Sequence, residues 1–426
     1  MLADLIVQNT REIVTPVATG APLKGAELGA PRVLADGALA SYEGRIVAVG
    51  PRKDLLAGIE LTPDALVLDA GQRVVVPGLV DPHTHLLFAG GREDEFQMRV
   101  RGESYLEIGR KGGGIVRTTA ATRSASQDAL VEQGRAHLRM MMRQGTTSVE
   151  IKSGYGLSTE SELAMLRAIR ILRETDKASI RSTFLGAHAV PPEYKASPDR
   201  YVDLVISEML PAVHAAGLAD YCDVFCETGY FDVDQSREIL RAAKSLGMKL
   251  KVHGNELAPS GGCRLAAEMG AVSVDHCNCL DDGDLEALRA VGTMAVGLPG
   301  TPFFKLAPTY ANGRRIVDAG VALALATDYN PTASISSMHF VMFLGCLEMG
   351  LEPAEALCAS TLNAAFAMGV EDSAGSLEVG KSADLLILDV EDFRHVPFYV
   401  GRDIIDLVVK GGKPVAGKRL AGGTWH

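Results

Sequence analysis

The chain has 426 residues, 47% of them hydrophobic and 22% charged, so a large core can form. Its net charge of −11 argues against affinity for nucleic acid, and its seven cysteines, few for this length, favour a reduced, cytoplasmic protein. No apolar run is long enough to predict a membrane span, and the first residues do not resemble a signal peptide.

Short β-rich runs alternate with longer amphipathic segments through the middle of the chain. The β-rich runs lie at residues 74–80, 146–151, 181–185, 221–225, 249–252, 272–274, 294–298 and 321–326. Apolar residues recur at the helical spacing of three and four in segments 160–174, 201–216, 233–246 and 280–290. Eight strands separated by helices predict parallel pairing through right-handed crossovers.

This alternation predicts an α/β fold, a (β/α)8 TIM-type barrel of about the usual 250 residues. An open doubly wound sheet is the competing arrangement, and segment 88–145 would be an elaborated first connection in the barrel. The two chain ends carry short strands and turns instead. We expect them to form one small β-sandwich domain, residues 1–73 plus 374–426, beside a barrel domain at residues 74–373.

The strongest chemical signal is the His-x-His pair His83 and His85, at the end of an apolar run. Residues i and i+2 of an extended strand point the same way, so both imidazoles can reach one metal ion. Three further predicted strands end in a polar residue, namely His253, His276 and Asp328. Because the carboxyl ends of the strands form the active-site face of such a barrel, these side chains are expected to meet.

Three histidines and one carboxylate, His83, His85, His253 and Asp328, suit zinc and also iron. They leave room for a water molecule, which is typical of a catalytic rather than a structural site. Glu256, three residues after His253, is the candidate for proton transfer. His276 is a candidate to polarise the substrate carbonyl, or to hold the water together with Asp328.

Several longer segments resemble the imidazolonepropionases, a family of the amidohydrolase superfamily, over most of the chain. They are DPHTH at residues 81–85, FAGGR at 88–92, GGGI at 112–115, EIKSGYGL at 150–157, FLGAHAVPPEY at 184–194 and DVFCE at 223–227. The His-x-His pair and the Asp at a strand end are common to the whole superfamily. KSGYGL and GAHAVPP are much more specific to this family.

The resemblance implies hydrolysis of 4-imidazolone-5-propanoate to N-formimino-L-glutamate by a homodimer with one zinc or iron ion. It implies that His83, His85, His253 and Asp328 bind the metal, and that Glu256 and His276 are catalytic beside Asp328. It places the following residues around the substrate: Arg92, Tyr105, Tyr155, His188, Glu256, Asn330 and Thr332. Arg92 supplies the fork of donors that a propionate group needs.

One departure concerns Thr332 and Ala333, where many members of the family have Gly and a hydroxyl residue. Backbone amides can still hold a carboxylate there, so the departure affects the end that binds the propionate tail and not the metal chemistry. Which of Glu256 and His276 acts as the general base stays open, as does zinc versus iron.

Two other functions are compatible with part of this pattern. Deaminases of purine- or pyrimidine-like heterocycles have a similar set of metal ligands, but we would not expect the segments around Tyr155 and His188 in them. A scaffold protein that has lost its metal is disfavoured because every expected ligand is present.

Overall fold

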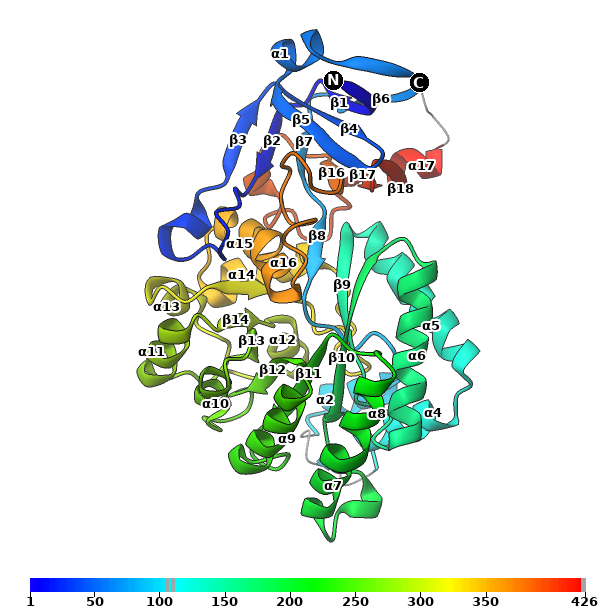
Figure 1. The fold of residues 1–426 in the computed structure, drawn as a ribbon. Coiled ribbons are helices and arrows are strands. Elements are labelled where there is room, and N and C mark those ends of the chain that lie inside the picture. Colours follow the sequence, from blue (N-terminus) through cyan, green and yellow to red (C-terminus); the bar gives the residue numbers. More distant parts are fainter. Residues whose placement is uncertain (104–106, 109–111, 423–426) are drawn as a thin grey trace.

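The computed structural model describes residues 1–103, 107–108 and 112–422 (Figure 1). Its centre is an eight-stranded parallel sheet in which the strands follow one another in chain order. The strands are β8 (Leu79–Asp81), β9 (Thr146–Lys152), β10 (Ser179–Ala187), β11 (Tyr221–Cys226), β12 (Lys249–Gly254), β13 (Ser273–His276), β14 (Met294–Gly297) and β15 (Leu323–Leu325).

The first and last strands of this sheet meet through the residues that follow them. The backbone N–H of His85 donates to the carbonyl of Tyr329 over 2.9 Å, and that of Asp328 donates to the carbonyl of His83 over 3.1 Å. Thr84 and Tyr329 form an isolated parallel bridge. The barrel is therefore nearly closed, which confirms the (β/α)8 prediction over the open doubly wound sheet.

Helices surround the barrel (Figure 1). They are α4 (Ile115–Ser124), α5 (Gln127–Arg143), α6 (Thr159–Thr175), α7 (Pro198–Leu204), η3 (Val205–Met209), α8 (Leu210–Ala215), α9 (Val233–Ser245), α10 (Gly262–Met269), α11 (Asp282–Val291), α13 (Gly313–Asp318), α14 (Met338–Met349), α15 (Pro353–Ala359) and α16 (Leu362–Met368). Two short helices, α2 (Glu93–Val100) and α12 (Gly300–Lys305), follow β8 and β14. None of the helices in the described ranges has the length and apolar character that crossing a membrane requires.

Strands from both chain ends form two further sheets beside the barrel (Figure 1). One sheet has the order β5 (Arg45–Pro51), β4 (Gly37–Tyr42), β1 (Leu2–Gln8) and β6 (Glu60–Asp69). The other has the order β18 (Lys413–Ala416), β17 (Ile405–Lys410), β16 (Leu385–Leu388), β7 (Val74–Pro77), β2 (Glu12–Thr15) and β3 (Arg32–Ala35). Short helices at the ends are η1 (Gly25–Gly29), α1 (Arg52–Ala57), η4 (Phe393–His395) and α17 (Lys418–Gly422).

Apolar side chains of both outer sheets share one buried cluster, which includes Leu5, Leu39, Ile387 and Leu407. The expected sandwich of N- and C-terminal strands is therefore present. The exact domain boundaries, at residues 73/74 and 373/374, stay a prediction.

The predicted first barrel strand, residues 74–80, is in fact two strands in two sheets. β7 pairs with β2 and β16 in the outer sheet, whereas β8 pairs with β9 in the barrel. Gly78 lies between them, where a Cβ atom would approach Thr147 Oγ1 to 2.3 Å. Both halves of the run are apolar because both are buried, so hydrophobicity does not reveal the change of sheet.

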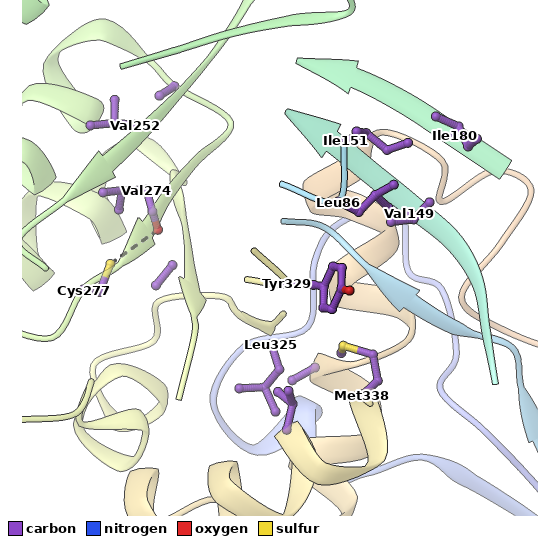
Figure 2. Close-up of a cluster of buried hydrophobic side chains, with 14 of the residues drawn as sticks. Leu86, Val149, Ile151, Ile180, Val252, Val274, Cys277, Leu325, Tyr329 and Met338 are labelled. Atoms are coloured by element: carbon purple, nitrogen blue, oxygen red, sulfur yellow. Dashed lines mark hydrogen bonds between the residues drawn. The ribbon is translucent and has the colours of Figure 1, made fainter. Parts of the chain in front are cut away.

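The barrel strands β9, β12 and β13 alternate between apolar and polar residues, although both kinds are buried. Val149, Ile151, Val252 and Val274 belong to the large apolar cluster of the molecule (Figure 2). The residues between them in sequence, Glu150, Lys251 and others, are buried and charged. Because successive side chains of a strand point to opposite faces, these three strands turn a polar face to one side and an apolar face to the other, whereas the apolar cluster of Val80, Val296 and Ala324 comes from β8, β14 and β15.

Candidate metal centre and active site

The predicted metal-binding residues lie at the carboxyl ends of the barrel strands. His83 and His85 follow β8, His253 lies in β12, His276 ends β13, and Asp328 follows β15. All five side chains are buried. Residues far apart in the sequence thus meet at one end of the barrel, as the fold class leads one to expect.

Three imidazoles and one carboxylate converge there. The ring nitrogens of His83, His85 and His253 that could bind a metal all lie within 4.8 Å of one another. The Nε2 atoms of His85 and His253 are 3.3 Å apart. Oδ1 of Asp328 lies 3.5 Å from Nε2 of His83 and 3.6 Å from Nε2 of His85.

The protonation state of the imidazole rings is the one that a metal ion requires of its ligands. Nδ1 of His83 lies 2.6 Å from Oδ2 of Asp275, so its proton faces the carboxylate and Nε2 retains its lone pair. Within the described residues, Nε2 of His83 is buried without a hydrogen-bond partner. Burial, with smaller effects of nearby cations, holds the pKa values of His83 and His85 well below their usual range. Neutral imidazoles beside a carboxylate are suitable ligands for zinc or iron.

Unusual backbone conformations gather around the same centre. His276, Cys277, Asn255 and Asp328 have positive φ angles, of 79°, 58°, 52° and 50°. Such conformations are costly for residues with a Cβ atom and persist only where the surrounding structure enforces them. The strand ends are therefore held in shapes that direct particular side chains into the barrel mouth.

Glu256 and His276 face each other beside the histidines. Oε2 of Glu256 lies 3.6 Å from Nε2 of His276, and Nζ of Lys305 lies 2.5 Å from Oε1 of Glu256. Burial would raise the pKa of Glu256, but His276 and Lys305 outweigh it and lower this pKa to about 2. Lys305, on α12, is a partner that the sequence did not indicate.

Tyr155 and His188 adjoin the metal-ligand histidines. The ring of His188 stacks on that of His85, with centroids 4.8 Å apart and an angle of 12° between the planes. The Tyr155 ring lies 5.2 Å from His188 and 5.8 Å from His85. Burial, followed by the charge of His253, lowers the pKa of His188 to about 3.

Arg92 is buried and held by an acidic neighbour. Its Nε and Nη2 donate to Oε2 of Glu95, over 2.9 and 2.7 Å. The other carboxylate oxygen of Glu95 accepts the N–H of Gly114 over 2.9 Å. Tyr105, another predicted contact of the substrate, lies outside the described residues.

Asn330 organises the turn after β15. Its Oδ1 accepts the backbone N–H groups of Thr332 and Ala333, over 2.8 and 3.0 Å, and its Nδ2 donates to the carbonyl of Asp328 over 2.6 Å. The two amides that we expected to be available for a carboxylate therefore donate within the turn in this structure.

Sequence comparisons decide the family. Residues 74–415 match the Amidohydrolase family. The chain is 48% identical over 412 residues to an imidazolonepropionase of Symbiobacterium thermophilum, covering 96% of each protein. It is 46% identical over 417 residues to an imidazolonepropionase of Geobacillus kaustophilus, covering 97% of this chain and 98% of the relative. The chain belongs to the imidazolonepropionase family.

Solved structures show how widely this family shares its fold. A zinc-bound adenosine deaminase of Xanthomonas campestris superposes with a TM-score of 0.72 at 19% identity, covering 98% of this chain and 94% of that one. Guanine deaminase of E. coli gives a TM-score of 0.74 at 15% identity, covering 97% of this chain and 99% of that one. The similarity of these two deaminases to the present chain concerns the fold alone.

A network of charged side chains lies behind the histidines, and none of its members was predicted. It comprises Glu150, Lys152, Asp223, Lys251 and Asp275, all fully buried. Lys251 contacts Glu150, and Nδ1 of His253 lies 2.9 Å from Oδ2 of Asp223. Charged residues in the middle of apolar parallel strands are the signal that could have revealed them, because unpaired charges are rarely buried.

Two further residues that the sequence did not indicate, Glu162 and Arg123, hold the turn that carries Tyr155. The buried carboxylate of Glu162 accepts the N–H groups of Gly154, Gly156 and Leu157, over 3.1, 2.8 and 2.8 Å. Arg123 donates to the carbonyls of Gly156 and Leu157, over 2.6 and 2.8 Å. In the sequence, Glu162 looks like any residue of an amphipathic helix.

Proposed function

We propose that this chain hydrolyses the ring amide C–N bond of 4-imidazolone-5-propanoate to give N-formimino-L-glutamate. Water adds to the ring carbonyl carbon, the C–N bond breaks, and the ring nitrogen takes up a proton. The observation that carries the proposal is the convergence of His83, His85, His253 and Asp328 in a chain of this family.

These four side chains would hold one divalent ion, zinc or iron, since their donor atoms suit both. When bound, such an ion lowers the pKa of a coordinated water to about 7 and so supplies a nucleophile at neutral pH. Asp328 is further oriented by Thr301, whose hydroxyl donates to its Oδ2.

Glu256 and His276 would move the protons. Their side chains are 3.6 Å apart, so both can reach the same small group at the barrel mouth. The ammonium of Lys305, 2.5 Å from Oε1, keeps Glu256 ionised, which suits a carboxylate that accepts a proton at Oε2. His276 would donate a hydrogen bond to the carbonyl oxygen that becomes negative during attack.

The remaining predicted residues would bind and orient the substrate. Arg92 would hold the propionate, with Glu95 fixing the direction of its guanidinium group. Tyr155 and His188 lie against the ring of His85 and are proposed to contact the imidazolone ring. We further propose that Tyr105, Asn330 and Thr332 line the pocket, Asn330 and Thr332 through the turn that they form.

The test is a ring-opening assay on the purified protein. We expect loss of the ultraviolet absorbance of 4-imidazolone-5-propanoate together with formation of N-formimino-L-glutamate. A parallel assay measures ammonia released from purine and pyrimidine bases. Release of ammonia without ring opening of the imidazolone would contradict the proposal and favour a deaminase.

We also propose that the protein is a cytoplasmic homodimer. All seven cysteines are free, which is compatible with a reducing compartment. Light scattering coupled to size exclusion measures the mass in solution. A mass equal to one chain of 45.1 kDa would contradict the dimer.

A further inference from the structure

Two carboxylates stand directly behind two of the candidate metal ligands. Oδ2 of Asp275 lies 2.6 Å from Nδ1 of His83, and Oδ2 of Asp223 lies 2.9 Å from Nδ1 of His253. A carboxylate at Nδ1 keeps the proton on that nitrogen and turns the lone pair of Nε2 toward the metal position. The direction of both imidazoles therefore depends on where these carboxylates are held.

Lys152 joins the two carboxylates. Its Nζ lies 2.8 Å from Oδ2 of Asp223 and 3.4 Å from Oδ2 of Asp275, the same two oxygens that face the histidines. It is anchored by Glu150, whose Oε1 is 2.7 Å away, and its side chain has no exposed surface. An ammonium group has three donors, and here three acidic residues surround it.

We propose that Lys152 is a positioning residue of the metal centre, which fixes Asp223 and Asp275 so that His253 and His83 present Nε2 to one ion. This inference rests on the proposed metal site. Lys152 itself touches neither the ion nor the substrate. It acts on the two histidines through one carboxylate each.

A purely electrostatic role of Lys152 would have the opposite effect on the metal. A positive charge near the site repels a cation, so its removal would strengthen metal binding if Lys152 did nothing else. Loss of positioning weakens metal binding instead, because the histidines are no longer held in a common direction. The sign of the change in zinc affinity therefore separates the two roles.

The experiment measures Zn²⁺ binding to metal-free protein by competition with a chromogenic chelator. For Lys152→Met we expect affinity to fall about ten- to a hundredfold, the usual effect of losing a group that orients metal ligands. Glu150→Gln is the matched control: its amide oxygen can still accept from Lys152, and the residue faces no ligand histidine, so we expect a much smaller loss. Affinity of Lys152→Met equal to or above that of the parent would overturn the proposal.

A double-mutant cycle tests the route through Asp275. We expect Asp275→Asn to weaken zinc binding, and the double variant with Lys152→Met to lose less than the sum of the two single losses. Additive losses would contradict a shared route. Lys152→Gln, which retains a polar end, takes the place of Lys152→Met if circular dichroism shows that the latter is unfolded, with the same expected sign. A parent protein that binds no zinc would refute the metal site itself, which is a distinct outcome.

Discussion

The inside of the barrel and the inside of the outer sandwich are both fully buried, yet they are built from different residues. Between the outer sheets, the cluster around Leu5, Leu39, Ile387 and Leu407 is apolar throughout. Inside the barrel, Lys251 and its acidic partners occupy comparable positions on the strands. Apolar burial stabilises without dictating direction, whereas buried charges cost free energy unless every one is paired. The difference shows that the charged part of the barrel, on β9, β11, β12 and β13, is organised to orient polar groups, and the sandwich to hold the chain ends together.

The largest expected effect is on catalysis, from His83→Ala. Loss of one ligand removes the stabilisation that the metal gives to the reaction, several kcal/mol, so turnover should fall at least about a thousandfold. Metal content by mass spectrometry should fall as well, while circular dichroism stays unchanged. Full activity of a metal-free variant would refute the mechanism. It would also refute the conclusion that the buried polar side chains of the barrel serve a metal site.

The next effect concerns stability inside the barrel, from Lys251→Met. The variant leaves Glu150 buried with one cation fewer, so we expect a loss of about 3 to 5 kcal/mol in the free energy of unfolding. Urea denaturation provides the measurement. The control is Lys251→Met combined with Glu150→Gln, which should recover part of the loss because no charge is stranded. A single variant as stable as the parent would show that the pairing does not matter.

A smaller effect is expected on substrate binding, from Arg92→Ala. Charge-assisted hydrogen bonds contribute about 1.5 to 3 kcal/mol, so KM should rise roughly ten- to a hundredfold. The variant also leaves Glu95 without its partner, so Arg92→Ala with Glu95→Gln serves as the control for that stranded charge. An unchanged KM would remove Arg92 from the pocket.

The smallest effect should come from the sandwich, with Ile387→Val. Removal of one buried methylene costs about 0.5 to 1.5 kcal/mol of unfolding free energy and should leave KM and turnover unchanged. Denaturation and the ring-opening assay, run on the same preparation, measure both. A change in turnover would show that the sandwich also tunes the active site, and the contrast drawn above would fail.

The sequence predicted the part of the site that local patterns describe. His83 and His85 share a strand face, and His276 and Asp328 end apolar runs, so the barrel fold alone brings them together. Lys152 and Asp275 lie on strands β9 and β13, and their contact depends on the curvature of the closed barrel. No local pattern encodes such a pairing.

The break at Gly78 and the role of Glu162 were hidden for a related reason. In residues 74–80 every position is buried on one sheet or the other, so periodicity carries no sign of the change. Glu162 faces inward from α6, where its position predicts burial and not the three amides that it binds. Hydrophobic spacing identifies a buried face without identifying what lies opposite.

The pairing of β7 with β16 has a consequence for the order of synthesis. β7 leads through Gly78 into the strand that presents His83 and His85, but its neighbour β16 is made more than 300 residues later. A ribosome-bound chain that ends before Leu385 has no partner for this edge of β7. The residues that lead into the first ligand strand can therefore reach their final pairing only after Leu385–Leu388 have been synthesised.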